Sequence, residues 1–345
     1  RHEIGLRRSP RSIRELMSAY GDLVTAITPC LLVSPDSVAR FLPVGSVDVD
    51  LVVFDEASQI TVPGAVGAIG RGRSTVVVGD RKQMPPPPTA HRGDLEGGAD
   101  GAAASILDRC EQVGVLRRNL SWHYRSQVES LIAFSNKHYY GGDLRTFPGP
   151  LTLAAPDPGP TGFGVSWRRV HGRYYPDKVG AGRARRAEVR PSTNPVEAHE
   201  VVAEVLRRFE ASAERIPSLG VLTLNVRQRD LIEDMLRERG SSRIVEALDA
   251  RDGLLVRNLD NIQGEERDTF LFSLTFSANE RGDVPLNFGS LNHEGGERRL
   301  NVAITRARRQ MVVFSSFDPE NLHAERSAHR GVKDLRRYLE MARSG

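Results

Sequence analysis

The stretch LVVFDEASQI, residues 51–60, places four apolar residues directly before two adjacent carboxylates, Asp55 and Glu56. A short Val-rich run bounded by polar residues is typical of a buried parallel strand. In open α/β sheets, ligands bind outside the carboxyl ends of such strands. A carboxylate pair there can hold Mg²⁺ through one or two oxygens while water and phosphate complete the shell. The alternative is that Asp55 caps a following helix and Glu56 is solvated, and this stretch alone does not decide between them.

The residues around this stretch alternate between strand-like and helix-like segments. Strands are expected over 29–33, 51–54 and 74–78, and near 115–120, and helices over 12–20, 34–42, 62–70 and 102–110. Ser34 is the expected cap of the second helix, with Pro35 in its first turn. A Pro/Gly-rich loop occupies 85–102. Strands separated by helices of this length predict a parallel sheet, which we assign to a first domain over residues 1–118.

A second α/β domain is predicted over residues 119–345. Its expected helices are 126–140, 194–211 (capped by Asn194) and 225–240, and its expected strands are 219–224, 268–276 and 309–316. The chain between about 148 and 195 reads as irregular and carries seven arginines. It could be a basic arm that binds nucleic acid, but we favour a solvated insertion.

Composition excludes several classes of protein. The 345 residues are 27% charged and 39% hydrophobic with a net charge of +4, as in a globular protein that tolerates anionic partners. Only four of the 48 basic residues are lysines (Lys82, Lys137, Lys178 and Lys333), a bias that suits phosphate binding but is also typical of a GC-rich genome. Cys30 and Cys110 have no zinc-binding spacing. Without an apolar span of 18 residues or a signal peptide, we expect a cytoplasmic protein with no membrane partner.

Four further stretches place polar residues where ligands commonly bind. Gly79, Asp80 and Gln83 follow a predicted strand, where Gly permits close approach of a ligand and Gln can orient water. The other candidates are Arg125 in LSWHYRS, Gly264 and Glu265 in a turn within 258–268, and Arg306 and Arg308, which are expected on a helix within 298–310. Any one of these stretches could be purely structural.

Together and in this order, these stretches resemble the motifs of the two RecA-like motor domains of superfamily 1 helicases. The matching stretches are DEASQ (55–59, motif II), GDRKQMPP (79–86, motif III), HYRS (123–126, motif IV), NLDNIQGEE (258–266, motif V) and LNVAITRAR (300–308, motif VI). The most similar branch contains the nonsense-mediated-decay helicase and its DNA-replication and bacterial relatives. The resemblance covers nearly the whole chain and implies an α/β fold of two RecA-like parallel-sheet domains, the first incomplete at its N-terminus.

The resemblance also implies roles for individual residues. Asp55 would hold Mg²⁺, Glu56 would align the attacking water as general base, and Gln83 would couple the γ-phosphate to the nucleic-acid groove. Arg125 and Arg306 would stabilise the γ-phosphate in the transition state. The remaining nucleotide-binding residues would be Asp80, Gly264, Glu265 (at the ribose) and Arg308. The implied activity is ATP-dependent movement along single-stranded nucleic acid, with DNA favoured over RNA and a 5′ to 3′ polarity.

One part of such a motor is missing from the sequence. The phosphate cradle G-x-x-x-x-G-K-[ST] (Walker A) does not occur, and none of the four lysines lies in such a loop. We therefore expect the Walker A segment upstream in a longer polypeptide, and negligible turnover by this chain alone. The alternative is a non-catalytic nucleic-acid-binding or scaffolding module derived from a helicase.

Overall fold

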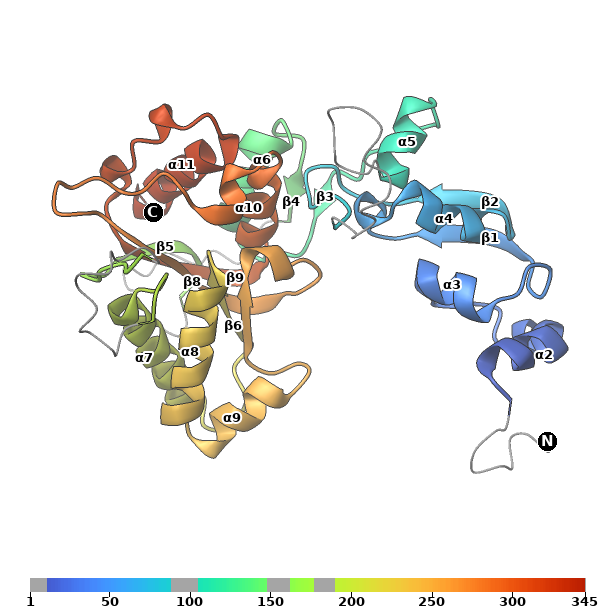
Figure 1. Ribbon diagram of the computed structural model, residues 1–345, viewed down its shortest axis with the longest axis horizontal. Coiled ribbons are helices and arrows are strands. Elements are labelled where there is room, and N and C mark those ends of the chain that lie inside the picture. The colour runs from blue at the N-terminus through green and yellow to red at the C-terminus, as the bar shows by residue number, and fades with distance from the viewer. Residues whose placement is uncertain (1–10, 88–104, 148–161, 177–189, 345) are drawn as a thin grey trace. The chain divides into compact units, whose positions relative to one another are not determined.

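A computed structural model of the chain describes residues 11–87, 105–147, 162–176 and 190–344 (Figure 1). Its internal contacts divide the chain into two units, Arg1–Asn119 and Leu120–Gly345. Both units are α/β structures whose strands pair in parallel, as predicted.

The first unit is built on a pair of parallel strands. These are β1 (Val49–Phe54) and β2 (Gly72–Val77), with Phe54 opposite Val77. The helices are α2 (Ile13–Ile27), α3 (Pro35–Phe41), α4 (Val62–Ile69) and α5 (Ile106–Gln112). Ser34 caps α3 as expected, because its hydroxyl accepts the N–H of Ser37. Phe54 packs with Ala65 and Ile106 on one face of the pair.

Two strands predicted for the first unit were wrong. Residues 29–33 and 115–120 have no regular secondary structure. Both stretches are apolar, but a strand also needs a neighbouring strand to take its backbone hydrogen bonds, and a local pattern carries no information about that neighbour. Most of the predicted loop at 85–102, and the start of the helix predicted at 102–110, lie outside the described residues.

The second unit contains a five-stranded parallel sheet in the order β5-β9-β8-β6-β7. The strands are β5 (Gly164–Arg169), β6 (Leu219–Thr223), β7 (Leu255–Asn258), β8 (Arg267–Ser277) and β9 (Ala307–Ser316). Helices cover both faces, α7, α8 and α9 on one and α6, α10 and α11 on the other (Figure 1). Val221, Leu271, Val312 and Phe314 are fully buried where the sheet meets the first of these layers. This is the RecA-like arrangement that the sequence predicts.

The helices of this unit are α6 (Ser130–Tyr139), α7 (Pro195–Ala211), α8 (Val226–Arg239), α9 (Ser242–Asp249), α10 (Gly296–Ile304) and α11 (Arg330–Ser344). A short parallel pair, β3 (Trp122–His123) and β4 (Arg145–Thr146), precedes and follows α6. Asn194 caps α7 as predicted.

Three predictions for the second unit need correction. The stretch expected to be irregular, 148–195, contains β5, which pairs with β9 along its whole length. The helix expected at 126–140 begins only at Ser130. The helix expected to carry Arg306 and Arg308 ends at Ile304, and Arg308 lies in β9. Sequence analysis also missed β7, α9 and α11.

A search of the described residues for a membrane-crossing segment found no helix that is both long and apolar enough.

Candidate functional site

The carboxylates that follow β1 occupy a tight turn. Asp55 is exposed, and its Oδ1 accepts the N–H of Glu56 at 2.9 Å. Glu56 has a φ of +49°, in the left-handed region that side chains other than glycine rarely adopt. Such strain is concentrated at functional sites. The alternative helix-capping role for Asp55 does not hold for α4, because Thr61 caps that helix.

The residues that follow β2 pack directly against this turn. The N–H of Ala57 donates to the carbonyl oxygen of Val78 at 2.9 Å. Asp80 organises its own loop, because its carboxylate accepts the Lys82 N–H at 2.8 Å and the Gln83 amide at 3.1 Å. In the described part of the chain, the buried Oε1 of Gln83 has no hydrogen-bond donor. Asp55, Glu56, Asp80 and Gln83 therefore gather at one end of the β1–β2 pair.

Gly79 lets these two turns approach each other. A Cβ at this position would lie 3.0 Å from the backbone nitrogen of Ser58 and 3.1 Å from that of Ala57. Since these two neighbours are backbone atoms, and Leu107 Cδ2 also lies 3.0 Å from this Cβ, Gly79→Ala should displace the turn and lower the free energy of unfolding by about 1–3 kcal/mol. Urea unfolding and hydrogen exchange over residues 51–60 test this effect.

Gly67→Ala is the matched control for this prediction. Gly67 lies within α4, and the nearest atom to an added Cβ is the flexible Arg71 Nη1 at 3.6 Å. This variant should be neutral or stabilised by up to about 1 kcal/mol. Equal destabilisation by the two substitutions would contradict the proposed close approach.

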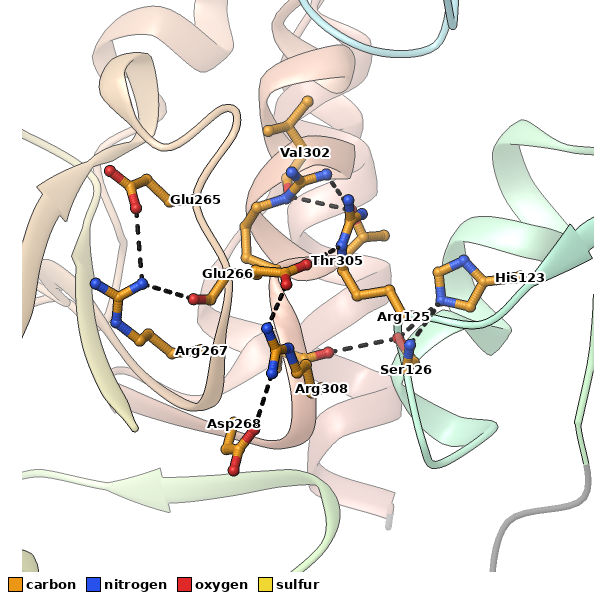
Figure 2. Close-up of polar contacts among 12 residues, drawn as sticks. His123, Arg125, Ser126, Glu265, Glu266, Arg267, Asp268, Val302, Thr305 and Arg308 are labelled. Carbon is orange, nitrogen blue, oxygen red and sulfur yellow. Dashed lines mark hydrogen bonds and ion pairs between the residues drawn. The ribbon is translucent and has the colours of Figure 1, made fainter. Parts of the chain in front are cut away.

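In the second unit, two of the predicted arginines converge on one carboxylate. The Arg125 Nε donates to Glu266 Oε2 at 3.0 Å, and Arg308 Nη2 donates to Glu266 Oε1 (Figure 2). Arg308 also lies 3.8 Å from Asp268. Hydrogen bonds from Arg308 and, to a smaller extent, from Arg125 lower the pKa of Glu266, which stays ionised. The Glu266 carboxylate thus holds two guanidinium groups. Because all three side chains are partly exposed, an anionic ligand could replace this carboxylate as the partner of the two arginines.

Arg306 is placed differently from Arg125 and Arg308. It is 1% exposed, and its Nε donates back to the carbonyl oxygen of Val302 at 2.8 Å at the end of α10. Its Nη2 lies 3.3 Å from the Thr305 hydroxyl. The cation therefore stabilises the carboxyl end of the helix, where backbone carbonyls lack helical partners.

The turn before β8 is held by a neighbouring arginine. Gly264 has a φ of +85°, which only glycine adopts at little cost. Arg267 donates to the carbonyl oxygen of Gly253 at 3.0 Å. It also donates to the carbonyl oxygen of Glu266 at 2.7 Å and lies 3.7 Å from the Glu265 carboxylate (Figure 2). Glu265 and Glu266 therefore point to different partners, and it is Glu266 that reaches the arginines.

Sequence analysis missed two residues of this site, Glu266 and His123. Glu266 is part of the motif that the sequence shows. Which of the two adjacent glutamates faces the arginines, however, depends on how the chain enters β8. His123 belongs to the same HYRS stretch as Arg125 and gave no separate signal.

No group of three or more His, Cys, Asp or Glu side chains suited to a metal ion occurs among the described residues. Asp55 with Glu56 still fits Mg²⁺, which is commonly held by one or two carboxylates plus water and phosphate.

Comparison with known proteins identifies related sequences. Residues 102–318, more than half of the chain, match the family model AAA_12, described as an AAA domain. The chain is 29% identical over 333 residues to the "Uncharacterized ATP-dependent helicase MG140 homolog" of Mycoplasma pneumoniae, covering 92% of this chain and 27% of that protein.

Two eukaryotic relatives are more distant. The DNA-binding protein SMUBP-2 of Mus musculus is 26% identical, covering 94% of this chain and 30% of that protein. The DNA replication ATP-dependent helicase/nuclease DNA2 of Saccharomyces cerevisiae is 25% identical, covering 89% of this chain and 20% of that protein. The chain thus spans less than a third of the length of these three relatives.

Proposed function

We propose that this chain, which belongs to the AAA_12 family of AAA domains in a helicase-like branch of superfamily 1, is part of an ATP-dependent helicase or translocase. The observation that carries the proposal is the convergence of Arg125 and Arg308 on Glu266. Two guanidinium groups that share a replaceable carboxylate form a ready binding site for phosphate oxygens. The turn with Asp55 and Glu56 supplies the carboxylates that phosphoryl transfer also needs, one for the metal ion and one for the attacking water.

We propose the following division of roles. Asp55 binds Mg²⁺, which when bound neutralises charge on the phosphates, and Glu56 orients and deprotonates the attacking water. Arg125 and Arg306 stabilise negative charge on the γ-phosphate, and Gln83 couples that phosphate to the nucleic-acid strand. The residues proposed to contact the rest of the nucleotide are Asp80, Gly264, Glu265 and Arg308. Glu266 holds Arg125 and Arg308 until phosphate replaces it.

We also propose that another segment of the same polypeptide completes the first unit. One face of the β1–β2 pair is apolar yet exposed, with Leu51 at 51%, Val53 at 57% and Val76 at 45%. A parallel sheet whose two faces are both apolar is normally covered on both sides. A segment with a Walker A loop, which these 345 residues lack, would cover this face and supply the phosphate cradle.

The proposed partner is single-stranded nucleic acid, with DNA favoured over RNA because two relatives are named for DNA binding and DNA replication. Such strands are bound through backbone charge and base stacking, without reading of sequence. Hydrolysis would move the two RecA-like units against each other and so drive translocation, in the 5′ to 3′ direction by family resemblance. Partial duplexes with either a 5′ or a 3′ overhang test the polarity.

ATPase turnover with and without single-stranded DNA or RNA is the direct test. The longer natural polypeptide should show strand-stimulated turnover that Glu56→Gln abolishes, because the variant cannot accept the proton from water. The 345-residue chain should show negligible turnover. If the longer polypeptide binds the strand but never hydrolyses ATP, the protein is a binding module and the motor proposal is wrong.

A further inference from the structure

His123 lies at the junction of the two segments that carry the proposed catalytic arginines. Its Nε2 accepts the backbone N–H of Ser126 at 3.1 Å, and the Ser126 hydroxyl lies 2.9 Å from the same nitrogen (Figure 2). Arg125 is inside the turn that this contact closes. The side chain of residue 123 therefore determines how the backbone turns at Arg125.

The same turn is tied to the start of β9. The Ser126 hydroxyl lies 3.4 Å from the carbonyl oxygen of Ala307, and the Gln127 N–H donates to the carbonyl oxygen of Arg308 at 2.7 Å. These bonds connect residues 123–127 to the segment that carries Arg306 and Arg308. A change in the turn would shift both arginine-bearing segments relative to each other.

We propose that His123 is a positioning residue for phosphoryl transfer, whose neutral imidazole holds Arg125 in register with Arg306 and Arg308. The proposal rests on the proposed ATPase function. His123 does not touch the reacting phosphate in this role. It acts only through the hydrogen-bond acceptor that it offers to Ser126.

The imidazole of His123 has to be neutral for its Nε2 to accept the hydrogen bond from Ser126. A proton on Nε2 would point at the Ser126 N–H, so two donors would face each other and the contact would be lost. Burial, together with the charges of Arg125 and Arg306, lowers the pKa of His123 to about 4. The proton of the neutral ring is then on Nδ1, and the ring adds no third positive charge to those of Arg125 and Arg306.

Three variants of the longer natural polypeptide separate this role from simple packing. His123→Gln keeps an acceptor at the position of Nε2, whereas His123→Ala removes it. His138→Ala is the control, because His138 is another partly buried histidine of the same unit, which packs on Phe134 in α6. We expect His123→Ala to lower kcat by about 10- to 100-fold with little change in the KM for ATP. His123→Gln should keep kcat within about threefold of the wild type.

The outcomes are distinct. If His123→Ala leaves kcat unchanged, or if His123→Gln loses as much as His123→Ala, the acceptor is not what matters and the proposal is wrong. If His138→Ala lowers kcat as much as His123→Ala at a matched loss of melting temperature, His123 is only a packing residue. Rescue by Gln together with an active His138→Ala supports positioning.

A second measurement does not depend on ATPase activity. Nitrogen-15 NMR of the 345-residue chain should show His123 neutral between pH 5.5 and 8, with its proton on Nδ1, and His123→Ala should shift the Ser126 amide resonance. A proton on Nε2 or an ordinary titration would overturn the proposed contact. If the NMR result holds while the natural polypeptide has no ATPase, the motor function fails and the arrangement of the turn stands.

Discussion

Replacing Arg125 with alanine should reduce the strand-stimulated ATPase of the proposed longer polypeptide by about 10³- to 10⁵-fold, the effect typical of an arginine that stabilises phosphoryl transfer. Its side chain is one-third exposed and is bonded to a carboxylate that a phosphate can replace. The loss should appear in kcat, because the interaction strengthens as charge develops on the phosphate. Initial-rate kinetics over a range of ATP concentrations measure it.

The stability of the folded chain should change little in this variant. The Arg125–Glu266 pair is partly exposed, and such pairs contribute about 0–1 kcal/mol. Arg239→Ala, which removes an exposed arginine from the last turn of α8, is the matched control and should leave turnover unchanged. Turnover of Arg125→Ala within tenfold of this control would exclude a direct role for Arg125.

Arg306→Ala should behave differently, although we propose a related role for it. Because Arg306 is 1% exposed and bonded to the Val302 carbonyl oxygen at the end of α10, its removal leaves a buried cavity and takes one hydrogen bond from that oxygen. Lower melting temperature and lower turnover should therefore occur together. The contrast with Arg125 identifies which arginine acts on phosphate alone and which also supports the fold.

Glu197→Ala should strongly destabilise the second unit, lowering its free energy of unfolding by about 3–5 kcal/mol. The Glu197 carboxylate is completely buried and accepts the Ser273 hydroxyl at 2.7 Å, the Thr275 N–H at 2.6 Å and the Ser316 hydroxyl at 2.6 Å. Its loss leaves these donors buried without an acceptor. It also releases Thr275, whose φ of +70° marks an irregular point in β8. Urea unfolding measures the change.

The same carboxyl group should make stability depend on pH. Burial raises the pKa of Glu197 to about 7, above its ordinary value near 4.5, and the hydrogen bonds from Ser316, Ser273 and Thr275 offset only part of the shift. Since the folded state holds the proton more tightly, this contribution is complete below about pH 4.5 and is lost as pH rises through 7. The shift corresponds to about 3 kcal/mol.

Glu197→Gln is the control for this pH dependence. The amide cannot ionise, so its free energy of unfolding should vary less than that of the wild type between pH 5 and pH 8. Asp249→Asn, which changes an exposed carboxylate at the end of α9, should retain the wild-type slope. An unchanged slope in Glu197→Gln would show that Glu197 does not titrate in this range.

Local chemistry in the sequence was enough to place several elements. Ser34 and Asn194 begin helices because their side chains accept backbone N–H groups three residues on, an interaction contained within one short stretch. The strand that ends at Phe54 was predictable for a similar reason, because a run of large apolar residues stops abruptly at two charges. It was expected to be buried, but Leu51 and Val53 are exposed in the described chain. The order of the motifs then indicated the helicase-like family, which the relatives confirm.

The elements that the sequence did not predict correctly depend on interactions between distant residues. β5 was predicted as irregular because it reads as a polar, arginine-rich stretch, yet β9 supplies its hydrogen-bond partners about 145 residues away. Residues 29–33 are apolar and form no strand. Neither the presence of β5 nor the absence of a strand at 29–33 can be predicted from the residues of that stretch alone. A strand is stabilised by its neighbouring strand and not by its own composition.

The candidate site also contains some features that were predictable from the sequence and others that were not. The types of the site residues, and their places before or after strands, could be predicted from the sequence for Asp55, Glu56, Gln83 and Arg125. Three other features are seen only in the folded chain: Glu266, not Glu265, holds the arginines, Arg306 is buried against α10, and His123 closes the turn at Arg125. The Glu266 contacts join residues 42 and 141 positions apart, and the turn at Arg125 is tied to Ala307, which is 181 positions from Ser126. The direction of each side chain is also a property of the packed chain and not of its local pattern.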